Sequence, residues 1–140
     1  MVRAEKCPRL GQKLNWETEG QNGRKLTLDL DLIDGPLVGL RLIVHCHNHT
    51  DPTSYRAALV LEGERIRGVD SSLVARRKFY KEHIPQGWHE NLIDPNLPTN
   101  DPARNRHLAL KHFSPTDLQD FLRLLSERWH IQLDFEKVLL

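Results

Sequence analysis

Residues 38–50 read Val-Gly-Leu-Arg-Leu-Ile-Val-His-Cys-His-Asn-His-Thr, and this stretch decides the kind of fold that we expect. Side chains at alternate positions of a β-strand lie on one face, and the apolar set here is Leu40, Leu42, Val44 and Cys46. The alternation predicts a strand that buries this set and places His45 and His47 on the opposite face. His49 stands beside the turn-forming Asp51-Pro52 pair, so we expect it to belong to the turn.

Further strands are predicted on both sides of this stretch. Residues 24–33 alternate leucines with charged or polar residues, and residues 55–62 and 65–70 form two more short runs separated by Gly63. Residues 13–18 are expected to pair with residues 24–33 across a turn. Because strands joined by short turns pair with their neighbours, the expected sheet is an antiparallel meander.

The C-terminal part predicts one amphipathic helix. It follows a short strand at residues 107–113, with Ser114 as the expected N-cap and Pro115 at the first helical position. The apolar positions at helical spacing are Leu118, Phe121, Leu122, Leu125 and Trp129. Residues 131–135 are expected to add a last strand. We therefore predict a single α+β domain over residues 1–140, with a mainly antiparallel sheet of about five or six strands and one C-terminal helix packed on it.

Residues 71–106 differ in composition from the rest of the chain. They hold four prolines and several Asn and Asp residues, which predicts a long irregular loop inserted before the last strand and helix. The loop contains a basic run, Arg76, Arg77 and Lys78. Two interpretations stay open: a functional loop, and a surface loop that Trp88 anchors.

The overall composition limits the classes of partner. Of 140 residues, 39% are hydrophobic, which is enough for one core. Lys and Arg total 20 against 19 Asp and Glu, so a basic binding site has to be a local patch. The two cysteines have no paired spacing and suggest a reducing compartment, with a single bridge as the alternative. No apolar stretch has the length of a membrane span or signal-peptide core, so we expect a cytoplasmic protein without a membrane partner.

Eight histidines carry the candidate chemistry. Cleavage of RNA needs a group that takes the 2′-hydroxyl proton, an acid for the leaving oxygen and a cation for the phosphate. The expected catalytic residues are His107, His45 and His47. The expected substrate-binding residues are Arg106, Lys111, Arg76, Arg77 and Lys78. The alternative is that these side chains form an ordinary solvated surface.

A metal site is a further alternative. A His-x-His pair on a strand places two imidazoles on one face, as with His45 and His47. His89 with Glu90, or alternatively His107, would complete a site for a divalent ion such as zinc, and His89 is the expected third ligand. No carboxylate accompanies the pair at a diagnostic spacing. The chain also lacks a phosphate-binding Gly loop, a Cys-x-x-Cys pair and a Gly-x-Ser-x-Gly elbow.

Four segments of the C-terminal half carry a family resemblance. They are Arg65-Ile66-Arg67-Gly68-Val69-Asp70, Asn105-Arg106-His107, Phe113-Ser114 and Leu118-Gln119-Asp120-Phe121. Together they resemble the TumE-type toxins of bacterial toxin-antitoxin modules, in which a sheet hairpin reaches a basic, histidine-containing strand before a C-terminal helix. The resemblance implies a small toxin that acts on RNA and that an antitoxin partner neutralises.

Three functional hypotheses follow from these observations. The leading one is a toxin-like protein with ribonuclease-like activity, in which His107 serves as acid or base and Arg106 holds phosphate. The second is a non-enzymatic protein-interaction module that uses the exposed sheet face or the loop at residues 71–106. The third is a metal-dependent enzyme centred on His45 and His47.

Overall fold

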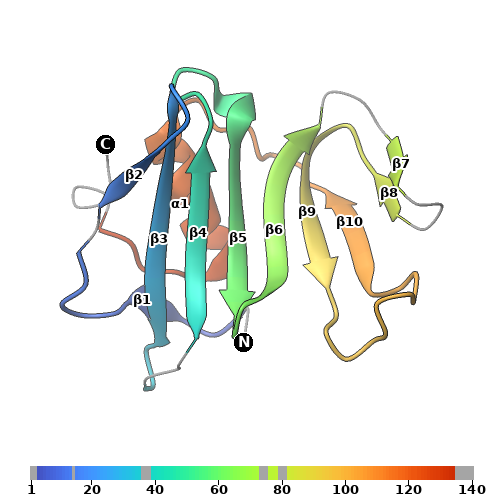
Figure 1. The fold of residues 1–140 in the computed structure, drawn as a ribbon, viewed down its shortest axis with the longest axis horizontal. Coiled ribbons are helices and arrows are strands. Elements are labelled where there is room, and N and C mark those ends of the chain that lie inside the picture. The colour runs from blue at the N-terminus through green and yellow to red at the C-terminus, as the bar shows by residue number, and fades with distance from the viewer. Residues whose placement is uncertain (1–2, 14, 36–38, 73–75, 79–81, 135–140) are drawn as a thin grey trace.

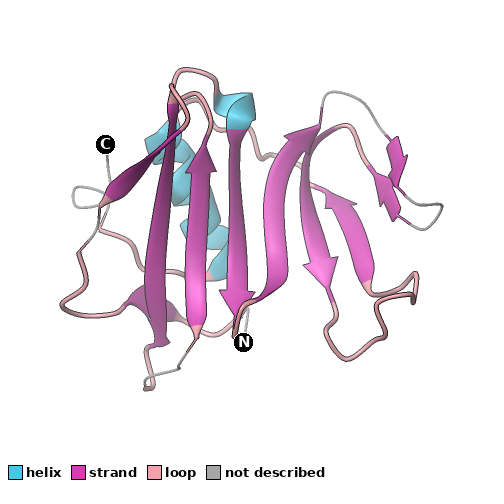
Figure 2. Cartoon of the chain, viewed as in Figure 1, coloured by secondary structure: helices cyan, strands magenta, loops and turns pink. Residues whose placement is uncertain are grey.

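The computed structural model describes residues 3–13, 15–35, 39–72, 76–78 and 82–134, with the backbone alone described at 76–78 and 82–83. These residues form an eight-stranded sheet, a separate two-stranded sheet and one α-helix (Figure 1, Figure 2). The strands of the large sheet are β1 (Lys6–Pro8), β2 (Trp16–Glu19), β3 (Gly23–Leu32), β4 (Leu40–Cys46), β5 (Tyr55–Leu61), β6 (Glu64–Ser72), β9 (Gly87–Ile93) and β10 (Asn105–Ala109). The remaining elements are β7 (Arg76–Lys78), β8 (Glu82–Ile84), the short 3₁₀ helix η1 (Pro52–Ser54) and the helix α1 (Leu118–Trp129).

The strand order in the large sheet is β1-β3-β4-β5-β6-β9-β10, and β2 also pairs with β3. All of these pairings are antiparallel. The predicted α+β class, antiparallel sheet and C-terminal helix are confirmed. The strand count is higher than the expected five or six, because short segments near the N-terminus and within the predicted loop also pair with the sheet.

One face of the sheet packs against α1, which lies behind β3, β4 and β5 in Figure 1. The side chains of Leu28, Leu42 and Leu122 are fully buried in this layer. Burying one leucine side chain stabilises a fold by about 1.5–3 kcal/mol, so the layer carries much of the stability. The predicted apolar face of residues 40–46 is confirmed, and it leaves His45 on the face away from the helix.

A β-bulge in β6 sends two nearby arginines to opposite faces. Leu59 pairs with Arg67, but the next residue of β5, Val60, pairs with Arg65, so Ile66 is an extra residue in β6. In a regular strand without a bulge, Arg65 and Arg67 would share a face, because side chains two positions apart point the same way. With it, Arg65 lines a pocket on the face away from α1, and Ile66 packs into the core beneath the helix.

Residues 71–106 do not form the single irregular loop that the composition predicted. Strand β9 lies between β6 and β10, and Trp88 packs against Phe113 and Phe121 with ring centroids 5.2 and 5.6 Å away. The prediction was wrong because β9 has polar residues on both faces, so no apolar alternation marks it. Its irregular portion includes residues 94–104, which connect β9 to β10.

The helix begins later than predicted. Asp117, rather than Ser114, is the N-cap, and its Oδ1 accepts a hydrogen bond from the Asp120 backbone N–H at 2.8 Å. Asp and Ser cap helices about equally well, so the residue that satisfies the first free N–H groups is set by the local chain path. Pro115 therefore precedes the helix, which ends at Trp129 with His130 in the left-handed conformation.

The predicted strand at residues 131–135 is replaced by a single bridge. Ile131 makes an isolated parallel bridge with Lys6, and Phe135 lies outside the described residues. Lys6 is fully buried at this junction, where its Nζ donates to the carbonyl oxygens of Ala4 at 2.7 Å and Trp129 at 2.6 Å. Burial lowers the pKa of Lys6 from 10.5 to about 8. A buried ammonium group thus joins the N-terminal segment to the end of α1.

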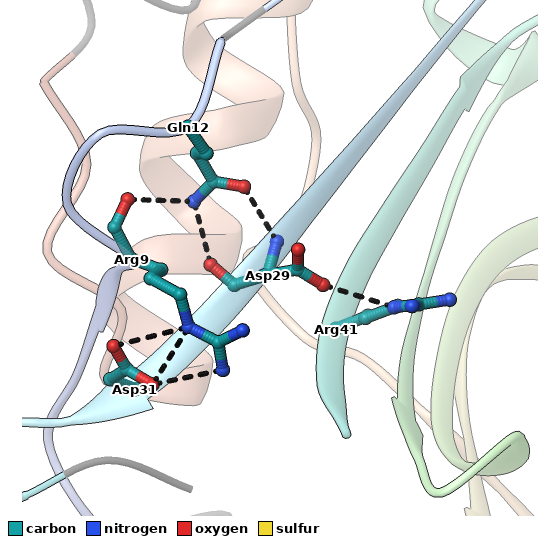
Figure 3. A network of polar contacts seen from close by, with 5 residues as sticks. All are labelled: Arg9, Gln12, Asp29, Asp31 and Arg41. Atoms are coloured by element: carbon teal, nitrogen blue, oxygen red, sulfur yellow. Dashed lines mark hydrogen bonds and ion pairs between the residues drawn. The ribbon is translucent and has the colours of Figure 1, made fainter. Parts of the chain in front are cut away.

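A side-chain network holds the N-terminal segment along β3 (Figure 3). The Gln12 amide copies a strand partner: its Nε2 donates to the Asp29 carbonyl at 2.7 Å, and its Oε1 accepts from the Asp29 N–H at 2.9 Å. Arg9 forms an ion pair with Asp31 at 3.1 Å, and Arg41 of β4 forms another with Asp29 at 3.0 Å. The Gln12 contacts satisfy backbone groups of Asp29 that an open strand edge would expose.

Two further expectations concern the redox state of the cysteines and the presence of a membrane span. Cys7 and Cys46 are both free thiols, and burial raises the pKa of Cys46. No helix among the described residues is long and apolar enough to cross a membrane.

Candidate functional site

A pocket of about 390 Å³ lies on the sheet face opposite α1. Strands β4, β5, β6, β9 and β10 line it, and Ile84 of β8 adds a side chain that is only 3% exposed. Charged and titratable side chains at its surface are His45, Arg56, Arg65, Asp70, His89 and His107. Pockets for small ligands span about 300–1,000 Å³, so this one has room for a nucleotide-sized group.

An ion pair enclosed in the pocket wall joins β6 to β9. Asp70 and His89 are directly opposite in the strand register, and His89 Nε2 lies 2.7 Å from Asp70 Oδ1. The side chain of His89 is 2% exposed and that of Asp70 is 46% exposed, so the carboxylate faces the pocket while the imidazole is enclosed. The second ring nitrogen, Nδ1, lies 3.1 Å from the carbonyl oxygen of Gly87.

Two hydrogen-bond acceptors lie beside the His89 ring, the Asp70 carboxylate and the Gly87 carbonyl oxygen. Burial raises the pKa of Asp70, but the hydrogen bond from His89 and the charges of His89, His107 and Arg56 outweigh it, so the pKa falls below its usual value. Asp70 is therefore ionised at neutral pH. A carbonyl oxygen and a carboxylate only accept hydrogen bonds, so these two contacts favour the form of His89 that is protonated on both nitrogens.

His107 of β10 lies against this pair. Its ring meets the ring of His89 edge-on, with centroids 5.3 Å apart and planes at 60°. His107 pairs in register with Asn91, whose Oδ1 is enclosed and has no hydrogen-bond partner in the described part of the chain. The pocket thus places the His107 imidazole beside the Asp70–His89 pair and the Asn91 amide oxygen.

A second polar cluster occupies the β4 end of the pocket. His45 Nδ1 lies 2.8 Å from Glu19 Oε1, and this hydrogen bond holds the pKa of Glu19 below its usual value. The ring of His47 is nearly parallel to that of His45, with centroids 6.0 Å apart and an interplanar angle of 10°. His47 itself follows β4 and is exposed, as is His49 in the turn.

His45 and His107 line the same pocket from its two ends. Four strand-to-strand steps separate β4 from β10, which corresponds to roughly 19 Å across a sheet with strands about 4.8 Å apart. One phosphate group does not span that distance. Arg56 lies between the two ends, because it is opposite His45 in register and its charge acts on Asp70.

The predicted phosphate-binding residues are not gathered around His107. Arg106 precedes His107 in β10 and lines a different pocket, because neighbouring side chains in a strand point to opposite faces. Lys111 is exposed in the segment after β10. The run at residues 76–78 forms β7, and its side chains lie outside the described part of the structure.

The predicted metal ligands are also divided between the two clusters. His45 lies next to His47, whereas His89 forms its ion pair with Asp70. Among the residues that the structure describes, no group of three or more His, Cys, Asp and Glu residues is arranged to hold a metal ion. The arrangement therefore gives the metal-site hypothesis no support.

Fold and pocket together define the chain as an α+β domain with a polar, histidine-lined cavity on the open face of its sheet. A scan of protein-family models, a search of curated proteins and a search of solved structures each gave no match to this chain. The likeness to TumE-type toxins accordingly stays a prediction from the residues quoted for it.

Three residues of the pocket were missed by sequence reasoning: Arg56, Arg65 and Asp70. The position of Arg56 was accessible, because β4 and β5 follow one another in the chain and pair antiparallel, with Arg56 opposite His45. Asp70 was not, because its partner His89 is on a strand that the sequence pattern concealed. Arg65 reaches the pocket through the bulge in β6, which has no apolar signature.

Proposed function

We propose that the protein binds RNA in the pocket on the open sheet face and cleaves it with His107 as the acid-base group. The observation that carries the proposal is the ring contact of His107 with the enclosed His89, which pairs with Asp70, in a pocket that Arg56 and Arg65 also line. A protonated His89 beside the His107 imidazole suits a reaction in which negative charge grows on a phosphate.

RNA is the substrate class because it carries its own nucleophile. His107 takes the proton of the 2′-hydroxyl, and the 2′-oxygen attacks the adjacent phosphorus while Arg56 and Arg65 neutralise the phosphate oxygens. The 5′-oxygen leaves and takes up a proton from water, and His107 releases the proton of the 2′-hydroxyl to solvent, so no net proton is gained or lost. The products are a 2′,3′-cyclic phosphate and a 5′-hydroxyl, so no oxidant, reductant or co-reactant is needed.

His89 has a different role in this scheme from the one that a free histidine would have. Its two nitrogens are directed at Gly87 and Asp70, and its side chain is almost wholly enclosed. It therefore positions His107 and supplies positive charge without exchanging protons with the substrate. His45 lies at the far end of the pocket and would contact a neighbouring nucleotide.

The biological setting that fits this activity is a toxin that an antitoxin protein neutralises. The resemblance of the C-terminal half to TumE-type toxins supports that setting, and an RNA-cleaving pocket is consistent with it. Expression of the wild-type chain is expected to arrest bacterial growth, and expression of the His107→Ala variant is not.

A cleavage assay tests the proposal directly. Wild-type protein is expected to cut a single-stranded RNA and to leave the same sequence in DNA intact, because DNA lacks the 2′-hydroxyl. His107→Ala should lower the rate by about 100-fold or more. His49→Ala is the matched control, since His49 is exposed in the turn outside the pocket. Absence of cleavage by the wild type, or equal cleavage by wild type and His107→Ala, would overturn the proposal.

A further inference from the structure

A second pocket, of about 530 Å³, lies on the helix side of the sheet and is separate from the first. Leu92 is at its centre, two residues along β9 from Glu90, which contacts the last turn of α1. Apolar side chains dominate its walls; among them are Leu61, Ile66, Leu92 and Leu97. The second pocket is thus mainly apolar, whereas the histidine-lined pocket is polar.

The loop that forms one wall of this second pocket is ordered by its own polar contacts. Asp94 Oδ1 accepts from the Asn96 N–H at 3.0 Å, and Asp101 Oδ1 accepts from the Ala103 N–H at 2.9 Å. The Asp94 N–H also donates to the Arg104 carbonyl at 2.9 Å. The wall is held in place without a ligand, which lowers the ordering cost of binding.

Two arginines line the second pocket beside its apolar side chains. Arg67 of β6 and Arg106 of β10 are both opposite Leu92 in register, so their backbones are roughly 10 Å apart with Leu92 between them. Arg67 directs Nη1 at the Ile66 carbonyl at 2.7 Å. Arg106 is exposed and has no hydrogen bond or ion pair to another residue in the described part of the chain. Its guanidinium is available to a ligand.

We propose that this second pocket binds an amphipathic anion, namely an apolar chain that ends in a carboxylate. The apolar walls favour the chain through the hydrophobic effect, and a guanidinium binds a carboxylate through two parallel hydrogen bonds. The only carboxylate among the lining residues, Asp94, accepts a backbone hydrogen bond from its own loop. This site does not depend on the RNA-cleavage proposal.

Calorimetric titration of the full chain with decanoate, decanol and acetate tests the assignment. Decanoate is expected to bind one molecule per chain, decanol to bind at least about 10-fold more weakly, and acetate not to bind. The double variant Arg67→Gln, Arg106→Gln should weaken decanoate at least about 10-fold and leave decanol unchanged. Arg41→Gln is the matched control, because Arg41 is an exposed arginine on β4 outside this pocket.

Ala103→Trp gives a second, independent variant. Ala103 is exposed and lines the pocket, so an indole there fills the cavity without replacing a core residue. The variant should keep the wild-type melting temperature and lose decanoate binding. Decanoate binding that is absent from the wild type, or equal in the wild type and Ala103→Trp, overturns the proposal. So does a wild-type dimer that Ala103→Trp dissociates, because the groove would then be a self-association surface.

Discussion

His89 and Glu90 are neighbours in β9, yet their buried charges serve opposite faces of the sheet. On the helix face, Glu90 accepts hydrogen bonds from Arg128 at 2.7 Å and from the Trp129 indole at 2.6 Å, and its side chain is 6% exposed. On the other face, His89 pairs with Asp70, which remains 46% exposed. The first cluster is closed and joins the helix to the sheet. The second is open on one side, and the pocket lies there.

Glu90→Gln is expected to have the largest effect on stability. The amide removes the charge that Arg128 and the Trp129 N–H share, and breaking a buried pair costs about 3 kcal/mol or more. Urea unfolding measures the loss. Glu127→Gln is the control, because Glu127 is 62% exposed in its pair with Arg123, and such a pair contributes less than about 1 kcal/mol. Equal losses in the two variants would contradict a structural role for Glu90.

Asp70→Asn is expected to cost less stability and more activity than Glu90→Gln. A hydrogen bond to a charged group contributes about 1.5–3 kcal/mol, and the exposure of Asp70 favours the lower end. RNA cleavage by the folded variant should fall steeply, because His89 loses the anion that holds it charged beside His107. Cleavage at the wild-type rate would show that the Asp70–His89 pair is not needed for catalysis. The contrast between a structural cluster at Glu90 and a functional cluster at Asp70 would then be wrong.

The same variant should change the response to acid. The pKa of Asp70 is lower in the folded protein than its usual value of 3.8, so its contribution to stability is present above that value. The contribution is lost as the pH falls through the lower, folded pKa. Between about pH 5 and pH 2, unfolding free energies of the wild type should therefore decline more than those of Asp70→Asn. Parallel acid profiles would contradict this.

Lys6→Met is expected to give the smallest of these effects, a change in how the free energy of unfolding depends on pH. Burial lowers the pKa of Lys6 to about 8, so above that pH the unfolded chain binds the proton that the folded chain has released. The stability of the wild type should rise relative to Lys6→Met as the pH rises from about 8 to 9, by at most about 1.4 kcal/mol. Urea unfolding at both pH values measures it; a constant difference would mean that the ammonium group titrates normally.

The sequence predicted one face of the molecule better than the other. The leucines of residues 24–46 and the stripe of α1 repeat at the periods of a strand and a helix, so the core could be located before the structure was known. The open face has no such period. His45 and His107, which the sequence predicted as catalytic residues, both line the pocket, but the pairing of Asp70 with His89 depends on the register of β6 and β9.

Strand β9 explains most of what the sequence concealed. Trp88 and Leu92 face the helix side while His89 and Asn91 face the pocket side, and the polar Glu90 lies among the apolar positions. Alternation therefore fails in β9 because a buried carboxylate replaces a hydrophobic side chain. A buried polar residue with hydrogen-bond partners interrupts the alternation of apolar and polar residues from which a strand is predicted.

Because β6 holds one extra residue, the effect of a deletion in this strand depends on which residue is removed. Deleting Ile66 would remove the extra residue and make Arg65 and Arg67 neighbours, which in a regular strand still point to opposite faces. Each pocket would keep its arginine, and the core would lose one apolar side chain. Deleting a regularly paired residue of β6 would instead reverse the facing of part of the strand and exchange side chains between the two faces of the sheet.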